Sequence, residues 1–319
     1  MSTLREKAGA LVYDWIPFEL RLRRDWKEIR NRNERIDVNA DGVRCDWRWT
    51  SELHICRIFP STGRRLMRVA FEEWPIAFGD AIAEEVAPRV SFVIGHRGME
   101  RLPHLLTTLR SLAGQRDTPI ECIVVEQSPE PQARESLPPG TRYIHTSVPP
   151  SLPYNRSWAF NVGARAARGD VLVLHDNDTV VPQRYATAVS DAIASGYEFA
   201  NLTRFVFNLQ TVDVTFDAPP RSIVQNTRGL STVAQRAAYF DIGGYDEAFV
   251  GWGGEDNDFW DRASTRHVQR HGFVPMIHLW HPPQPEKEIA NAPGLARYRE
   301  LERQPPEERI ARLKATPPR

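Results

Sequence analysis

Three carboxylates and three glycines lie within the ten residues 251–260, whose sequence is GWGGEDNDFW. The glycines allow the backbone to bend and to approach a ligand closely, and Trp252 offers a flat apolar surface on which a sugar ring can stack. Glu255 or Asp256 could then accept a proton from an incoming hydroxyl group as a general base. A solvated acidic helix start is the alternative, because the helix dipole favours carboxylates in a first turn. Both interpretations can hold, since a helix start fixes the direction of its carboxylates.

Two acids end a strongly apolar segment, DVLVLHDND, at residues 170–178. Residues two apart in an extended strand point the same way, so Asp176 and Asp178 can face one ligand. Such a pair of oxygen ligands suits Mg²⁺ or Mn²⁺ bound to phosphate, and the alternative is a turn capped by its own polar side chains. His278 and His281 in MIHLWH could complete the ligands of such a metal with imidazole nitrogens. The alternative for each histidine is an ordinary surface or core position.

Strand and helix alternate from Pro88 onward, and these elements must position the acids. We expect strands at 89–95, 120–128 and 170–178 and helices at 99–115 and 153–169. This order predicts an α/β fold with a parallel, doubly wound sheet whose ligands bind beyond the carboxyl ends of the strands. The polar residues that follow the strands lie in that zone: Arg97, Glu126, Asp176 and Asp178.

Residues 1–87 have a different character and contain no catalytic motif. Phe18, Leu22, Trp26 and Ile29 recur at helical spacing in a basic segment. This basic helix fits a membrane surface, and the alternative is a helix that packs its apolar stripe on the rest of the protein. Three strands are expected after it, at 42–49, 52–59 and 64–74.

The sequence thus divides into an N-terminal accessory region at 1–87, a main α/β domain at 88–285 and a charged, proline-rich tail at 286–319. The tail adds one short helix around 294–303 and carries no motif. No internal repeat is evident.

The composition is that of an ordinary globular protein, with 41% hydrophobic and 26% charged residues. Equal numbers of basic and acidic residues, 41 of each, argue against nucleic acid as the main ligand. No apolar run approaches the ~20 residues that span a bilayer, and the first residues lack the apolar segment of a secretory signal. Cys45, Cys56 and Cys122 show no metal-binding spacing and are expected to be reduced thiols, with Cys122 in the core. We therefore expect a cytoplasmic protein.

The motifs occur in the order seen in glycosyltransferases of the GT-A fold. The chain looks most like the β-1,4-galactosyltransferase family and related bacterial family-2-type enzymes, over about residues 89–283. The long GGYD and GWGGEDND block is the specific part of the resemblance, and the pieces VSFVIGHR, IVVEQS, NVG, HDND and MIHLWH support it. The resemblance implies a nucleotide-sugar donor and a divalent cation, Mn²⁺ or Mg²⁺.

On the donor side, the resemblance assigns roles to four residues. Asp178 resembles the metal-binding aspartate of the family's DxD motif, and Asp176 resembles its partner toward the ribose and the metal. Arg97 resembles an arginine near uracil, and Glu126 resembles a polar contact to the base. His281 lies in the position that supplies a metal-ligand histidine in bacterial relatives. In galactosyltransferases a Met-x-x-His sequence supplies ligands, and this chain departs from it, so His278 and His281 both stay candidates.

On the acceptor side, the glycine-rich block implies a lid and a base. Trp252 matches a lid tryptophan that contacts donor and acceptor, Gly253 and Gly254 belong to the lid, Glu255 is its acidic neighbour and Asp256 matches the catalytic base. The next residue is asparagine where galactosyltransferases keep another acceptor-binding aspartate, so the identity of the acceptor does not carry over.

Together these features predict transfer of a hexose or N-acetylhexosamine from a UDP-sugar to a hydroxyl group with inversion. UDP-galactose is the first donor to consider and UDP-N-acetylgalactosamine the second, with UDP-glucose and UDP-N-acetylglucosamine open. The acceptor is a glycan, a lipid-linked sugar or a protein. One alternative is a retaining enzyme like the polypeptide N-acetylgalactosaminyltransferases, which carry an asparagine at the position of Asp256. Another alternative is a noncatalytic protein that binds nucleotide sugars or glycans.

Overall fold

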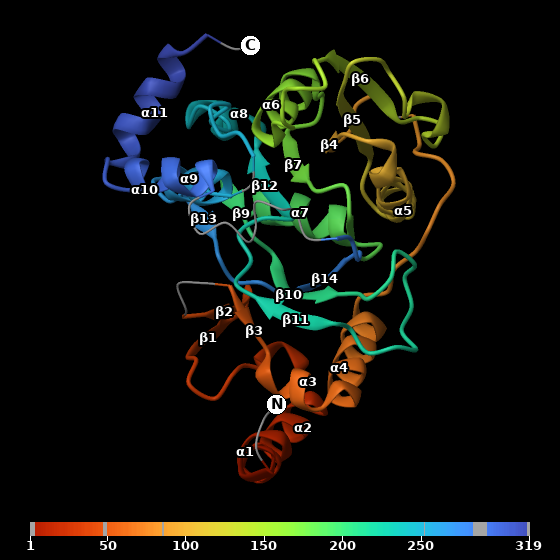
Figure 1. The fold of residues 1–319 in the computed structure, drawn as a ribbon, viewed down its shortest axis with the longest axis vertical. Helices are drawn as coiled ribbons and strands as arrows, with labels where there is room; N and C mark the ends of the chain where they lie inside the picture. Colours follow the sequence, from red (N-terminus) through yellow and green to blue (C-terminus); the bar gives the residue numbers. More distant parts are fainter. Residues whose placement is uncertain (1–3, 47–49, 85, 252, 283–291, 318–319) are drawn as a thin grey trace.

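The computed structural model describes residues 4–46, 50–84, 86–251, 253–282 and 292–317. Two sheets form the body of the protein, and Figure 1 shows the larger sheet with its helices in the upper half and the smaller sheet below it. The N-terminal helices lie at the lower end of this view, and the C-terminal helices lie at the upper left. No helix in these parts of the chain is long and apolar enough to cross a membrane.

The larger sheet has seven strands and is mostly parallel. Its strands, in spatial order, are β13 (Val268–Gln269), β9 (Phe199–Ala200), β12 (Ser231–Gln235), β7 (Val171–His175), β4 (Val90–His96), β5 (Ile120–Ser128) and β6 (Arg142–Ser147). Strands β7, β4, β5 and β6 run parallel, whereas β12 is antiparallel to both β7 and β9. The α/β fold on a mostly parallel sheet is therefore confirmed, and the strands predicted at 89–95, 120–128 and 170–178 are β4, β5 and β7.

Helices cover both faces of the larger sheet, because its central strands are apolar on both sides. One face packs against α5 (Leu102–Ala113) and α7 (Tyr185–Ala194). The other face packs against α6 (Arg156–Ala166), α8 (Arg236–Asp241) and α9 (Glu255–Ala263). Successive residues of one strand point to opposite faces of the sheet, so Cys122 and Ile123 of β5 belong to different cores. Short 3₁₀ turns occur at η3 (Met99–Arg101) and η4 (Arg134–Ser136).

The smaller sheet has five strands, and the sequence analysis did not predict it. Its spatial order is β3 (Ser51–Glu52), β11 (Ser222–Gln225), β10 (Thr203–Asn208), β14 (Val274–His278) and β8 (Thr179–Val180). It joins strands that are far apart in the sequence. Its last two strands, β14 and β8, position residues of the candidate site. β14 pairs antiparallel with β8, which begins directly after the acids of HDND.

The N-terminal region is mostly helical. Its elements are α1 (Leu4–Gly9), the π-helix η1 (Ala10–Trp15), α2 (Ile16–Leu22), the 3₁₀ turn η2 (Trp26–Glu28), the hairpin of β1 (Ile36–Asn39) and β2 (Gly42–Cys45), β3, α3 (His54–Ile58) and α4 (Pro60–Glu73). Phe18, Leu22, Trp26 and Ile29 are all buried, although the predicted helix ends at Leu22.

The strands predicted at 52–59 and 64–74 are wrong, because the chain forms α3 and α4 there. Leu66, Met67, Ala70 and Phe71 are buried on one side of α4. Their spacing is that of a helix, and it outweighs the strand propensity of the single valine and aromatic residues. Only the strand at 42–49 is found, as β2 and within its described residues.

The N-terminal helices share a hydrophobic core with the smaller sheet. Leu53, Met67 and Phe71 pack in one cluster with Phe205 and Phe207 of β10. The aromatic rings of Phe71 and Phe207 lie 5.6 Å apart. The division of the chain at residue 87 stays a prediction, and the structure shows that the two sides of this point are joined by a common core.

Candidate functional site

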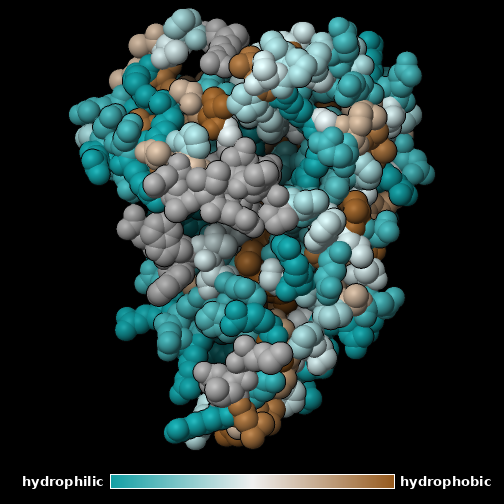
Figure 2. Space-filling model, in the orientation of Figure 1, coloured by the Kyte–Doolittle hydropathy of each residue, from teal (hydrophilic) through white to brown (hydrophobic). Residues whose placement is uncertain are grey.

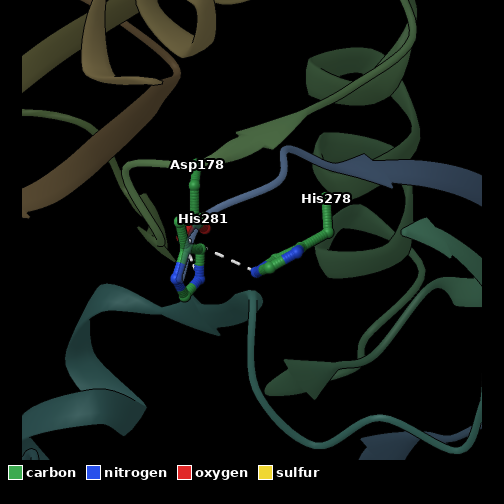
Figure 3. A group of neighbouring side chains, drawn as sticks. All are labelled: Asp178, His278 and His281. Carbon is green, nitrogen blue, oxygen red and sulfur yellow. Dashed lines mark ion pairs between the residues drawn. The ribbon is translucent and has the colours of Figure 1, made fainter. Parts of the chain in front are cut away.

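A carboxylate and two imidazoles come together where the two sheets meet (Figure 3). The pairing of β8 with β14 places His278 opposite Thr179. The backbone N–H of Leu279 then donates to the carbonyl of Asp178 over 2.9 Å, which draws the chain leading to His281 toward the same acid. This strand pairing explains why two segments a hundred residues apart meet. The sequence analysis did not predict the pairing.

The three side chains have the geometry and chemistry of a cation site. The Nε2 atoms of His278 and His281 lie 3.6 Å and 3.4 Å from Oδ2 of Asp178, and the ligand atoms of the three residues all lie within 4.8 Å of one another. The other oxygen of Asp178, Oδ1, is buried and has no hydrogen-bond partner among the described residues. A carboxylate with two imidazoles suits Mn²⁺ or another divalent transition metal. The residues present therefore fit the predicted metal.

Positive charge keeps the acid of this cluster ionised. Burial alone would raise the pKa of Asp178, but His278, Arg101 and His281 lower it further than burial raises it. Arg101 donates a short hydrogen bond to Oδ2 of Asp178 and a second, at 3.3 Å, to the Asn177 side chain. Burial lowers the pKa of His281 itself.

A second cluster of charged groups forms around Arg156, the first residue of α6. Its Nε donates to Asp176 over 2.7 Å, and its Nη1 donates to Asp256 over 2.8 Å and lies 3.6 Å from Glu255. One guanidinium thus joins the acids after β7 to the acids at the start of α9. The remaining nitrogen, Nη2, is buried and lacks a hydrogen-bond partner in the described chain. Tyr245 donates to the same oxygen of Asp256, Oδ1, over 2.9 Å.

Two of the acids around Arg156, Glu255 and Asp176, hold protons more tightly than free carboxylic acids do. The pKa of Glu255 is raised to about 7, chiefly by burial and then by the charge of Asp256, while Arg156 opposes both effects. Burial likewise raises the pKa of Asp176 to about 6, with Arg156 opposing and the charges of Asp178 and Asp256 adding to the rise. Oε2 of Glu255 is buried without a partner among the described residues. Groups with such pKa values in one cluster are typical of acid–base sites.

The start of α9 is fixed by a glycine with a backbone that other residues rarely adopt. Gly254 is the N-cap, with φ 93°, and a Cβ at this position would lie 2.5 Å from the carbonyl oxygen of Gly294 and 2.9 Å from Tyr298. Those two residues belong to the tail helix α10 (Pro293–Leu301). The tail therefore packs directly on the backbone that orients Glu255 and Asp256.

The third acid of the opening stretch points into the protein instead of the site. Asp258 is fully buried and accepts hydrogen bonds from Arg262, at 2.9 Å, and from Arg309, at 2.8 Å. Arg309 lies on the second tail helix, α11 (Pro306–Ala315), and is itself almost fully buried. The helix predicted around 294–303 is α10, whereas α11 and its buried arginine were not predicted.

We expect Arg309→Met to lower the free energy of unfolding by about 3 kcal/mol, because removing one member of a buried ion pair leaves the other charge without full compensation. Urea denaturation measures the effect. Arg312→Met is the matched control on the same helix, since Arg312 is half-exposed and pairs with Asp246. Its loss should cost about 1 kcal/mol or less. Equal effects of the two substitutions would show that the Arg309 pair does not hold the tail on α9.

The comparisons with known proteins bear on this site directly. Residues 99–240 match the family described as glycosyl transferase family 2, and residues 214–282 match the N-terminal domain of galactosyltransferase. The chain carries a glycosyltransferase domain that resembles the galactosyltransferase family. β-1,4-Galactosyltransferase 5 of Sus scrofa is 32% identical over 117 residues, and β-1,4-galactosyltransferase 6 of Homo sapiens is 31% identical over 115 residues. Each match covers 35% of this chain and 26% of the relative, so the chain aligns with about a quarter of their length.

Solved structures similar to the glycosyltransferase domain show low sequence identity. The catalytic domain of Drosophila β1,4-galactosyltransferase 7 in complex with xylobiose is 14% identical, with a TM-score of 0.39 over 68% of this chain and 79% of that one. A mannosyltransferase from Pyrobaculum calidifontis in complex with GDP-Man and Mn²⁺ is 15% identical, with a TM-score of 0.47 over 80% and 77%. GalNAc-T7 with UDP, GalNAc and Mn²⁺ is 13% identical, with a TM-score of 0.44 over 62% and 45%.

Two residues predicted to bind the donor have protein partners in this glycosyltransferase domain. Glu126 is buried at the end of β5, where its carboxylate accepts hydrogen bonds from Tyr143, Ser128 and the backbone N–H groups of Gln132 and Ala133. Arg97 donates to carbonyl groups of the 150–152 loop. Neither is in contact with Asp178 or Arg156. Their roles toward the donor stay predictions.

The residues predicted to form the acceptor side are described in part. Trp252 lies outside the described residues. Gly253 has φ 93°, and a Cβ there would lie 3.2 Å from Leu295 of α10, so this glycine also packs on the tail. Nη1 of Arg228 lies 3.5 Å from the side-chain oxygen of Asn257, so Arg228 is placed beside the first turn of α9.

Three charged or polar site residues were missed by the sequence analysis: Arg101, Arg156 and Tyr245. Arg156 had one usable signal, because it begins a helix directly after a loop at the carboxyl edge of the sheet. Tyr245 lies in the GGYD part of the resemblance but was given no role there, and Arg101 had no signal, since it lies outside the motifs and reaches the acids only through the tertiary fold.

Proposed function

We propose that the protein transfers a hexose or N-acetylhexosamine from a UDP-sugar to an acceptor hydroxyl group with inversion of configuration. Three buried polar atoms without partners among the described residues carry this proposal: Oδ1 of Asp178, Nη2 of Arg156 and Oε2 of Glu255. Buried polar groups are nearly always hydrogen-bonded in native proteins. These three atoms belong to the two neighbouring charged clusters, and a polyhydroxylated, anionic ligand would complete their hydrogen bonds.

The donor would lie along the strand ends of the cluster. Asp178, His278 and His281 would hold Mn²⁺ or Mg²⁺, and this cation, when bound, supplies positive charge for the diphosphate. Asp176 would contact the ribose side and add a carboxylate near the metal. Arg156 lies between this acid and the acids of α9, where its Nη2 can donate to an oxygen of the bound donor.

The acceptor would enter beside the first turn of α9. Asp256 accepts the proton of the acceptor hydroxyl group, the acceptor oxygen forms a bond to the anomeric carbon, and the bond from that carbon to the diphosphate oxygen breaks. The bond electrons leave with the diphosphate, so charge and atoms balance. Glu255 orients the acceptor through its unpartnered oxygen. The identity of the sugar follows from none of these contacts, and UDP-galactose is the first donor to test.

A panel of UDP-sugars tests the proposal. We expect UDP release from at least one of them to require Mn²⁺ or Mg²⁺ and to stop when EDTA removes the cation. The product of a full transfer reaction, analysed by NMR, should carry the inverted anomeric configuration. A retained configuration would favour the retaining alternative, and binding of UDP-sugars without turnover would favour the noncatalytic one.

A further inference from the structure

An unusual number of large hydrophobic side chains is exposed on the first helical segment. The elements α1, η1 and α2 follow one another without a break from residue 4 to residue 22. Six large apolar side chains in this segment are between 44% and 86% exposed: Leu4, Leu11, Val12, Tyr13, Ile16 and Leu20. Monomeric soluble proteins rarely leave so many apolar side chains together at the surface, and such a patch usually marks an interaction site.

The exposed side chains form a stripe of their own. Val12, Ile16 and Leu20 recur at intervals of four residues, so they lie along one side of the helical segment. Phe18 and Leu22, on another side, are buried in the core shared with the smaller sheet. The buried stripe fulfils the packing that the sequence predicted, and the second stripe has no packing role within the described protein.

Basic side chains surround the exposed stripe at both ends. Arg5 and Lys7 are exposed near its start, and Arg23 and Arg24 are exposed just after its end. None of these four makes an ion pair with a residue that the structure describes. The sequence of residues 4–24 holds five basic and three acidic residues. Two of these acids are paired, because Glu19 binds Arg65 and Asp14 lies 3.7 Å from Arg32. The charge left on this surface is therefore positive.

Figure 2 shows hydrophobic side chains at the lower end of the molecule, where Figure 1 places α1 and α2, next to strongly hydrophilic ones. The apolar stripe and the four basic residues, Arg5, Lys7, Arg23 and Arg24, together define what we term the basal surface. Helices that lie in a membrane interface have this combination of an apolar side and flanking Lys and Arg residues. Tyr13 adds an aromatic ring with a polar end, a type of side chain that prefers the boundary between lipid and water.

We propose that the basal surface binds the surface of a membrane that contains anionic lipids, with the apolar stripe inserted among the acyl chains and the basic residues at the headgroups. Positive charge distinguishes this partner from a second copy of the chain, because two basal surfaces of equal charge would repel each other. Membrane attachment here is independent of the chemistry of the proposed active site.

Flotation of the whole protein with vesicles tests the proposal. The protein should float with vesicles of phosphatidylcholine and phosphatidylglycerol and bind more weakly to vesicles of phosphatidylcholine alone. The double variant Ile16→Gln with Leu20→Gln should bind at least on the order of tenfold more weakly, because two apolar side chains no longer enter the lipid. Arg23→Gln with Arg24→Gln should lower the partition coefficient roughly fivefold for each charge removed, and only with the anionic vesicles.

The matched control is Val38→Gln with Phe78→Gln, which replaces two side chains that are 48% and 43% exposed elsewhere on the surface. This control should float as the unchanged protein does, and all variants should keep the same thermal unfolding midpoint. Failure of the unchanged protein to bind anionic vesicles, or an equal loss in the control, overturns the proposal. A concentration-dependent dimer that Ile16→Gln with Leu20→Gln abolishes, without any vesicle binding, would assign the surface to self-association.

Discussion

Asp178→Asn is expected to raise the Mn²⁺ concentration needed for UDP release by on the order of 10²-fold, because a metal contributes several kcal/mol at such sites and each 1.4 kcal/mol is tenfold. The amide keeps the size of the side chain but supplies no negative charge to the cation. In the unchanged protein, Oδ1 of Asp178 is the buried oxygen without a partner among the described residues, and Oδ2 lies near both imidazoles. Direct titration of Mn²⁺ binding by electron paramagnetic resonance measures the loss without depending on turnover.

The histidines and an unrelated ion pair provide the controls for this result. His278→Ala and His281→Ala should each weaken Mn²⁺ binding, since both Nε2 atoms approach the same carboxylate, and the larger effect identifies the stronger ligand. Asp37→Asn alters a carboxylate that also pairs with a histidine, His271, at 3.1 Å but lies far more exposed. It should leave Mn²⁺ binding unchanged. Equal Mn²⁺ affinity in Asp178→Asn and the unchanged protein would show that this cluster is not the metal site.

The sequence predicted the central strands β4, β5 and β7 of the larger sheet because their signals are local, whereas it did not predict β6, β9, β12 and β13. The runs VSFVIG, IECIVVE and VLVL are apolar on both sides, and helices α5 and α6 lie between them in the sequence, so the parallel arrangement follows from the order of the elements. The smaller sheet could not be predicted in the same way. It pairs β8 with β14 and β3 with β11, across about a hundred and about a hundred and seventy residues of sequence, and nothing in a short segment specifies such a partner.

The same distinction applies to the candidate site. Asp178, His278 and His281 were recognised as potential ligands from their residue types, but their meeting depends on the β8–β14 pairing. Among the three acids of GWGGEDND the sequence singled out Glu255 and Asp256 and gave Asp258 no role, and the fold also separates Asp258 from the other two. Asp258 is used to hold two buried arginines, whereas Glu255 and Asp256 face Arg156. The composition of the charged tail could not reveal that one of its arginines, Arg309, is buried against Asp258.

Asp256→Asn is expected to lower the transfer rate by about 10²–10⁴-fold, the usual contribution of a general base. The hydrogen bonds around this side chain make the test a sharp one. Arg156 and Tyr245 both donate to Oδ1, so the amide of the variant must present its carbonyl oxygen to them. Its NH₂ group then takes the place of Oδ2, the oxygen beside Gly229 that remains to accept a proton. Transfer is measured beside UDP-sugar affinity, which should change little.

Glu255→Gln distinguishes the two neighbouring acids. It removes a charge beside Arg156 but leaves Asp256 and its hydrogen bonds in place, so transfer should fall far less than in Asp256→Asn. The pH dependence gives a second criterion, because the pKa of Glu255 is raised to about 7. If Glu255 were the base, the transfer rate of the unchanged protein would rise with pH through this value, and Glu255→Gln would abolish that rise. Near-normal transfer by Asp256→Asn together with that loss in Glu255→Gln would assign the base to Glu255, because the rate would then depend on the ionised Glu255 and no longer on the carboxylate of Asp256.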